Sequence, residues 1–221
     1  MEKGRLEAFT DGVIAVIITI MVLELKPPHG ATFAALLDHW PIFLSYVLSF
    51  VYVGIYWNNH HHLLHAVAHV NGKVMWANLF FLFWLSLFPF TTSWLNESWL
   101  TDPRPALDHL PSLPNAPTAL YGFVLLMTAL SWIPLSRSLI ACNGGREGDL
   151  AQALGGEWGN WKAMVSPIIY LIAIVLALFA PIVSSSLSIV SCGLYALVAA
   201  IWFVPDRRIE NKVIENKVSS S

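Results

Sequence analysis

The sequence predicts an all-α integral membrane protein with six transmembrane helices and both termini in the cytoplasm. Of its 221 residues, 56% are hydrophobic and only 12% are charged, and the mean hydropathy is +0.61. Soluble domains carry about 25% charged residues, so this chain lacks the charge for a water-facing surface. Long apolar segments recur along the chain, and Lys and Arg gather in alternate loops. The net charge of -2 offers no basic field for nucleic acid, and no nucleic-acid partner is expected.

Six apolar segments are long enough to cross a bilayer. They are expected at about residues 8–25, 40–60, 76–95, 118–138, 163–183 and 187–204, which form one transmembrane domain over residues 1–205. The uncharged stretch Ala163–Pro205 is too long for one span, and Ser184–Ser186 divides it. Pro89 predicts a kink within the third segment. Residues 206–221 are expected to form a short cytoplasmic tail.

Lys and Arg predict the orientation in the membrane, because cytoplasmic loops carry an excess of both. Six spans place the two termini on the same side. Of the twelve Lys and Arg residues, two fall on the side opposite to the termini, namely Lys26 and Arg104. The other ten fall on the side of the termini, which is therefore expected to be cytoplasmic: Lys3, Arg5, Lys73, Arg137, Arg146, Lys162, Arg207, Arg208, Lys212 and Lys217.

The first segment has two distinct faces when it is drawn as a helix. At about 100° per residue, a stripe about 60° wide contains Gly12, Val16, Thr19 and Leu23, with Ile20 at its edge. Asp11 lies about 100° or more from the centre of this stripe. Periodicity alone leaves ordinary helix packing open for the stripe, with the Thr19 hydroxyl bonded to the carbonyl four residues back. It also leaves open that Asp11 is only a carboxylate near the helix N-terminus, where the helix dipole favours negative charge.

Histidines are concentrated at the end of the second segment. His60, His61 and His62 are consecutive, and His61, His65 and His69 share one helical face. Two histidines four residues apart can bind Zn²⁺, but no HExxH motif occurs and no carboxylate lies among them. No metal site is therefore predicted. The histidines are expected at the membrane interface, and one or two of them could pair with Asp11.

Three of these segments resemble a known family. Arg5-x-x-x-Phe9-Thr10-Asp11-Gly12 is similar to the RxxxFSD signature of the transmembrane protein 175 potassium channels, with Thr10 in place of Ser. Tyr56-Trp57 followed by His60-His61 looks like the second helix of that family, and Phe83–Leu95 looks like its third. The resemblance covers essentially the whole six-span layout.

The resemblance implies a potassium-selective channel in the cell membrane that works as a homotetramer and conducts K⁺ passively, without catalysis or a cofactor. Four first helices would line the pore around a hydrophobic constriction, and the sequence contains no TVGYG filter. The implied pore-lining residues, which coincide with the stripe, are Val16, Thr19, Ile20 and Leu23. The implied structural network around the motif comprises Arg5, Phe9, Thr10, Asp11, Trp57, His60 and His61.

Other functions are compatible with the same residues. A secondary transporter or proton-coupled carrier could use Asp11 and a histidine as a proton relay. A membrane enzyme could use the histidines as a metal site, although neither HExxH nor GxSG is present. A helical membrane protein with only a structural role also remains open.

Overall fold

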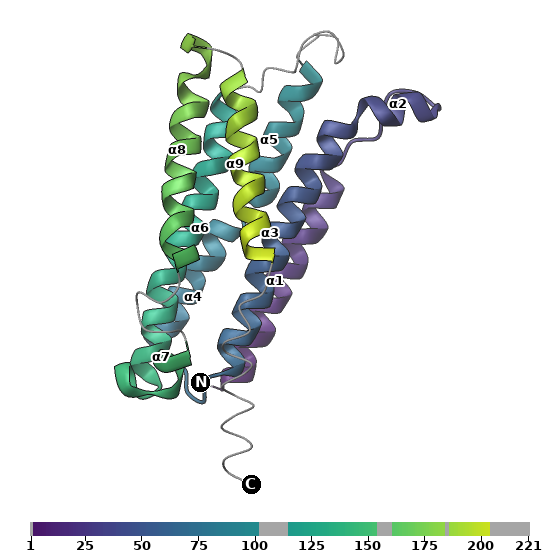
Figure 1. Cartoon of the computed structure of the whole chain (residues 1–221). Helices are drawn as coiled ribbons and strands as arrows, with labels where there is room; N and C mark the ends of the chain where they lie inside the picture. The colour runs from purple at the N-terminus through teal and green to yellow at the C-terminus, as the bar shows by residue number, and fades with distance from the viewer. Residues whose placement is uncertain (1, 102–114, 154–160, 184–185, 204–221) are drawn as a thin grey trace.

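The computed structural model describes residues 2–101, 115–153, 161–183 and 186–203, and all regular structure in these ranges is helical (Figure 1). The expected tail over residues 206–221 lies outside the described ranges. Of the expected break at Ser184–Ser186, residues 184–185 also lie outside them, and Ser186 begins α9. The longest helices are α1 (Lys3–Leu23), α3 (Trp40–His65), α6 (Asn115–Cys142), α8 (Trp161–Val183) and α9 (Ser186–Phe203). The third apolar segment forms α4 (Gly72–Leu85) and α5 (Phe88–Thr101), and three short helices are α2 (Phe33–Asp38), η1 (Gly145–Glu147) and α7 (Asp149–Ala153).

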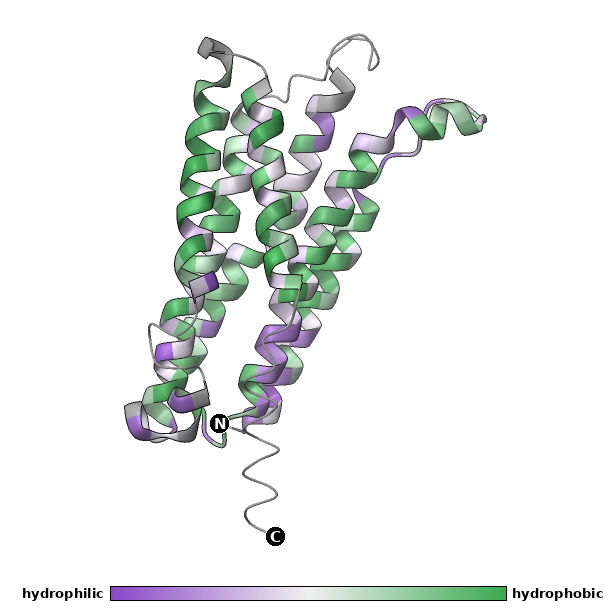
Figure 2. Cartoon of the chain, in the orientation of Figure 1, coloured by the Kyte–Doolittle hydropathy of each residue, from purple (hydrophilic) through white to green (hydrophobic). Residues whose placement is uncertain are grey.

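Five helical stretches among the described residues are long and apolar enough to cross a membrane. They are Lys3–Leu23, Trp40–His65, Gly72–Ser98, Ala116–Cys142 and Trp161–Ala180, and the apolar helix Leu187–Phe203 is shorter. Figure 2 shows apolar residues along most of the bundle and hydrophilic residues gathered at the end where α1 begins and α3 ends. The predicted all-α class is confirmed. Of the six predicted crossings, the sixth corresponds to the shorter helix Leu187–Phe203.

Prolines and side-chain caps set several helix ends. Pro27 and Pro28 follow α1 closely, and proline cannot continue a helix. Asn71 begins α4 by accepting hydrogen bonds from the backbone N–H groups of Lys73 and Val74. The third apolar segment is divided at residues 86–87. Pro89 lies in the first turn of α5 and has no N–H with which to bond the carbonyl of Leu85. The missing hydrogen bond accounts for a break between two helices, where the sequence predicted a kink within one.

The centre of the bundle is built around buried tyrosines from four helices. Tyr52 on α3, Tyr121 on α6, Tyr170 on α8 and Tyr195 on α9 are all nearly fully buried. The Tyr52 hydroxyl donates to the carbonyl of Tyr195 at 2.6 Å, and the Tyr195 hydroxyl donates to the carbonyl of Thr118 at 3.2 Å. Each ring supplies apolar area and each hydroxyl finds a partner, so the four helices are fixed against one another.

Helix α1 lies at the side of this bundle and contacts α3, α4 and α5 (Figure 1). One face of α1 is buried against these neighbours through Leu6, Thr10, Ile14, Ile17 and Met21. Its other face remains exposed within the single chain. This lateral position leaves the outer face of α1 available for contacts beyond its own chain, and α3 and α8 also carry exposed apolar side chains.

Candidate functional site

The exposed face of α1 carries the residues that the sequence placed on one stripe. Leu23 is 75% exposed, Val16 is 56% exposed and Ile20 is 42% exposed, and Thr19 is also exposed. The Thr19 hydroxyl donates to the carbonyl of Ala15 at 2.8 Å, as the packing interpretation expected. A hydroxyl oxygen that donates its proton keeps lone pairs that can accept, so Thr19 can still offer an oxygen outward.

Two separate hydrogen-bonded sets hold the beginning of α1 to the bundle. Asp11 accepts a hydrogen bond from the indole Nε1 of Trp57 on α3 at 2.9 Å. The hydroxyl of Thr10 accepts from Nδ2 of Asn78 at 2.9 Å, and Oδ1 of Asn78 lies 2.7 Å from Nε2 of His60. Because the Asn78 oxygen can only accept, His60 donates from Nε2. Helix α1 is thereby tied to α3 by Asp11 and to α4 by Thr10.

Asn78 is a member of this arrangement that the sequence interpretation missed. It is fully buried, as is Thr10, and His60 is only 1% exposed. The available signal was an amide inside the apolar segment at residues 76–95, where a buried polar side chain requires a partner. The helical periodicity of one segment could not identify that partner, because Thr10 and Asn78 belong to different helices.

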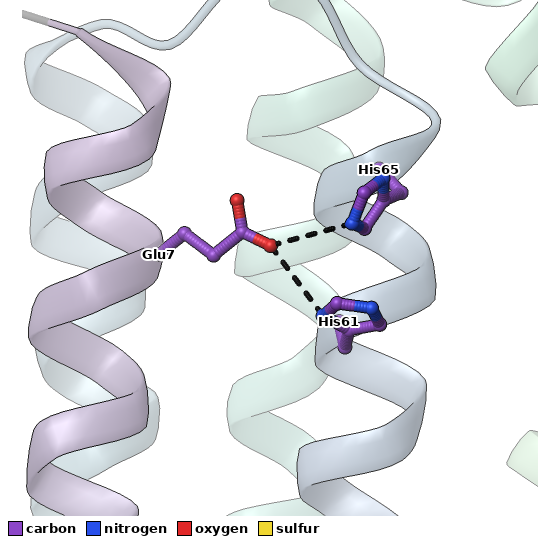
Figure 3. A group of neighbouring side chains, drawn as sticks. All are labelled: Glu7, His61 and His65. Carbon is purple, nitrogen blue, oxygen red and sulfur yellow. Dashed lines mark ion pairs between the residues drawn. The ribbon is translucent and has the colours of Figure 1, made fainter.

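A pairing of Asp11 with a histidine, which the sequence left open, is not present among the described residues. The histidines instead approach Glu7, whose Oε1 lies 3.4 Å from Nδ1 of His61 and 3.6 Å from Nε2 of His65 (Figure 3). His61 also stacks on Trp57, with ring centroids 5.9 Å apart. Glu7 lies one helical turn before Asp11 and so reaches the last turns of α3.

Arg5 and Phe9 lie outside these contacts. Within the part of the chain that the structure describes, no hydrogen bond or ion pair joins Arg5 to Asp11, and both Arg5 and Phe9 are exposed. The side chains of the motif residues therefore point in different directions within one chain. Thr10 points into the bundle and Asp11 contacts its rim, while Arg5 and Phe9 face outward.

The far end of α1 is anchored to α5. The Ser93 hydroxyl donates to Oε2 of Glu24 at 2.8 Å, and Nζ of Lys26 lies 2.7 Å from Oε2 of Glu97. The hydrogen bond and the negative charge of Glu97 raise the pKa of Lys26 above its ordinary value. An open groove of about 590 Å³ runs here between the two helices, lined by Ile20, Glu24, Ser86, Pro89, Phe90, Ser93, Trp94 and Glu97.

Known proteins are similar to this chain in sequence and in the arrangement of their helices. Residues 5–89 match the family model of the endosomal/lysosomal potassium channel TMEM175. A protein of Chryseobacterium sp. (strain P1-3), named a potassium channel, is 44% identical over 216 residues, which cover 98% of this chain and 100% of that protein. The chain belongs to the TMEM175 family. The resemblance read from the three segments is therefore confirmed.

Two further similarities are consistent with this family. A protein of Streptomyces collinus, also named a potassium channel, is 35% identical over 145 residues, covering 62% of this chain and 66% of that protein. The crystal structure of a lysosomal potassium-selective channel TMEM175 homolog from Chamaesiphon minutus superposes with a TM-score of 0.69 at 25% identity, covering 90% of this chain and 95% of that one. Together with the apolar helices, these matches make the chain a multi-pass membrane protein.

Proposed function

We propose that four copies of this chain form a potassium-selective channel whose pore is lined by α1. The observation that carries the proposal is the division of α1 into a buried face and an exposed stripe of Val16, Thr19, Ile20 and Leu23. Family membership adds support, because bacterial relatives are named potassium channels. Four such helices around an axis would place the stripes toward a shared lumen.

Selectivity in this proposal arises from partial dehydration of the ion. A narrow ring of apolar side chains such as Leu23 replaces little of the water that an ion must shed. K⁺ holds its water less tightly than Na⁺ does, so K⁺ crosses the ring at a lower cost. The Thr19 hydroxyls can offset part of the lost hydration, and closing the apolar ring would stop conduction by excluding water. Passive conduction requires no catalytic residue, metal or cofactor.

The proposed channel spans the cell membrane six times, with α9 as the sixth crossing and both termini in the cytoplasm. Figure 1 shows α9 running back toward the end of the bundle where α1 begins. Lys3, Arg5 and Lys73 belong to helix beginnings at that end, and Lys26 follows α1 at the opposite end. This distribution supports the orientation, because cytoplasmic ends attract Lys and Arg.

A flux assay in liposomes tests the proposal. Purified protein is reconstituted with opposed K⁺ and Na⁺ gradients, and the mass of the detergent-solubilised oligomer is measured in parallel. We expect the membrane potential to follow the K⁺ gradient, flux that does not saturate as a carrier does, and a mass of four chains. Saturable flux coupled to H⁺ movement would contradict the channel and indicate the proton-coupled carrier.

A further inference from the structure

Three side chains that the proposed conduction does not use converge at the beginning of α1. Glu7 comes from α1, and His61 and His65 come from consecutive turns of α3 (Figure 3). Their ligand atoms all lie within 4.8 Å of one another. We propose that Glu7, His61 and His65 form a binding site for a divalent transition metal, with Zn²⁺ as its simplest occupant, and that the bound metal joins α1 to α3.

The distances from the Glu7 carboxylate to the two histidines match the edges of a metal coordination shell. Zn²⁺ binds imidazole nitrogen at about 2.0–2.1 Å and carboxylate oxygen at about 2.0–2.2 Å, so neighbouring ligands of a tetrahedral site lie roughly 3.3–3.5 Å apart. The carboxylate oxygen of Glu7 lies 3.4 Å from His61 and 3.6 Å from His65. Both distances exceed the roughly 2.7–3.2 Å of an ordinary N–H···O hydrogen bond. Both distances from Glu7 therefore suit a shared metal ion, and the ligand atoms of the two histidines lie within 4.8 Å of each other.

The types of ligand select the class of metal. Two imidazoles and one carboxylate suit Zn²⁺ and other first-row transition metals, whereas Mg²⁺ and Ca²⁺ prefer oxygen ligands alone. Two histidines four residues apart on a helix lie on the same face and can bind one ion. The side chain of His65 is 60% exposed and that of His61 is 38% exposed, so water can reach the site and complete its coordination.

The surroundings favour binding at these two histidines over their neighbours. His61 stacks on Trp57, which restricts its ring, and its ring centroid lies 4.4 Å from that of His65. His60 is buried and already bonded to Asn78. His62 follows His61 in sequence but is not part of the cluster with Glu7, which makes it a matched control.

Binding of Zn²⁺ to the tag-free oligomer tests the site by isothermal titration calorimetry. We expect one Zn²⁺ per chain. Losing a residue that only supports a metal ligand weakens metal binding by roughly 10- to 100-fold. His65→Ala and Glu7→Gln each remove a direct ligand, so each should weaken Zn²⁺ binding by at least this factor. His62→Ala should bind as the unaltered protein does. With Co²⁺ as the probe, the visible absorption of a four-coordinate complex should form in the unaltered protein and disappear in His65→Ala.

Thermal unfolding tests whether the metal joins the two helices. Zn²⁺ should raise the midpoint of the unaltered protein and of His62→Ala, and it should leave His65→Ala unchanged, because a ligand that binds only the folded state stabilises it. His65 is the most exposed of the three, so this variant should fold normally, which its elution volume and circular dichroism check. Zn²⁺ affinity that is unchanged in both ligand variants, or equally reduced in His62→Ala, would overturn the proposal.

Discussion

Leu23 is the residue at which the proposed pore can be tested most directly. It is the most exposed side chain of the α1 stripe, at 75%, and it occupies the last position of the helix. Leu23→Ala removes three carbons from each chain, so four copies would widen an apolar ring considerably. We expect increased conductance and weaker discrimination between K⁺ and Na⁺, measured as the reversal potential in planar bilayers.

A leucine on another helix provides the control for this change. Leu171 on α8 is 51% exposed and lies far from α1 in the sequence. Leu171→Ala removes the same atoms and should leave the reversal potential unchanged. Equal selectivity in Leu23→Ala and the unaltered protein would argue against a constriction at Leu23.

Asn78 carries the second test at the level of single residues. Asn78→Ala leaves the buried Thr10 hydroxyl and the His60 ring nitrogen without the partner they have now. A buried polar group that loses its partner costs about 1–3 kcal/mol, so the two together should lower the free energy of unfolding by several kcal/mol. Thermal unfolding of the purified protein measures the loss.

The exposed Ser86 offers a control on the same apolar segment. Its hydroxyl donates to the carbonyl of Phe83, three residues earlier, and contacts no other helix through that bond. Ser86→Ala should change the unfolding midpoint little. Equal stability of Asn78→Ala and Ser86→Ala would show that the buried contact between α1, α4 and α3 does not hold α1 in place.

At the level of elements, the packing of α6 against α8 and α9 depends on a glycine. A Cβ added at Gly122 would overlap the hydroxyl of Tyr195, and it would lie 2.9 Å from a side-chain carbon of Ile174. Tyr195 cannot easily withdraw, because it is fully buried and its hydroxyl bonds Thr118. Gly122→Ala should therefore destabilise the protein by about 1–3 kcal/mol, the usual cost of overpacking a core.

Gly193 on α9 is the matched control, because a Cβ there would meet nothing within 4 Å. Gly193→Ala should preserve or slightly raise the unfolding midpoint, since alanine favours a helix over glycine. The comparison needs only the two midpoints in the same detergent. If both variants unfolded at the same temperature, α6 could move away from α9 without cost.

For the whole molecule, the proposed pore requires that the exposed face of α1 meets water. Val16 is 56% exposed while its neighbour Ile17 is 3% exposed. In a background without Cys142 and Cys192, Val16→Cys should react with a charged, water-soluble thiol reagent and lose K⁺ flux. Ile17→Cys should neither react nor lose flux, because it faces its own subunit.

The outcome separates a pore from a lipid-facing surface. A charged reagent does not enter hydrocarbon, so a Val16→Cys that faced lipid would stay unmodified and keep its flux. If Val16→Cys did not react in protein that still conducts K⁺, α1 would not line the pore at this position. The measurement therefore tests whether Val16 lines a water-filled path, while the mass of the oligomer tests the number of chains.

The sequence by itself determined the class of the protein. The scarcity of charge and the length of the apolar segments require helices in a bilayer, because each backbone N–H and C=O must be bonded within its own helix there. The α1 stripe followed from helical spacing alone, since residues on one helix have fixed angular positions. Its exposure in the fold agrees with that geometry.

Only the tertiary structure decided which polar groups meet. Thr10 bonds Asn78 and Glu7 approaches the histidines, and within the network implied by the resemblance Asp11 bonds Trp57 and not a histidine. Each of these contacts joins two helices, and their partners depend on the rotation and depth of one helix against another. Those two quantities are fixed by packing of the whole bundle, so the periodicity of a single segment does not contain them.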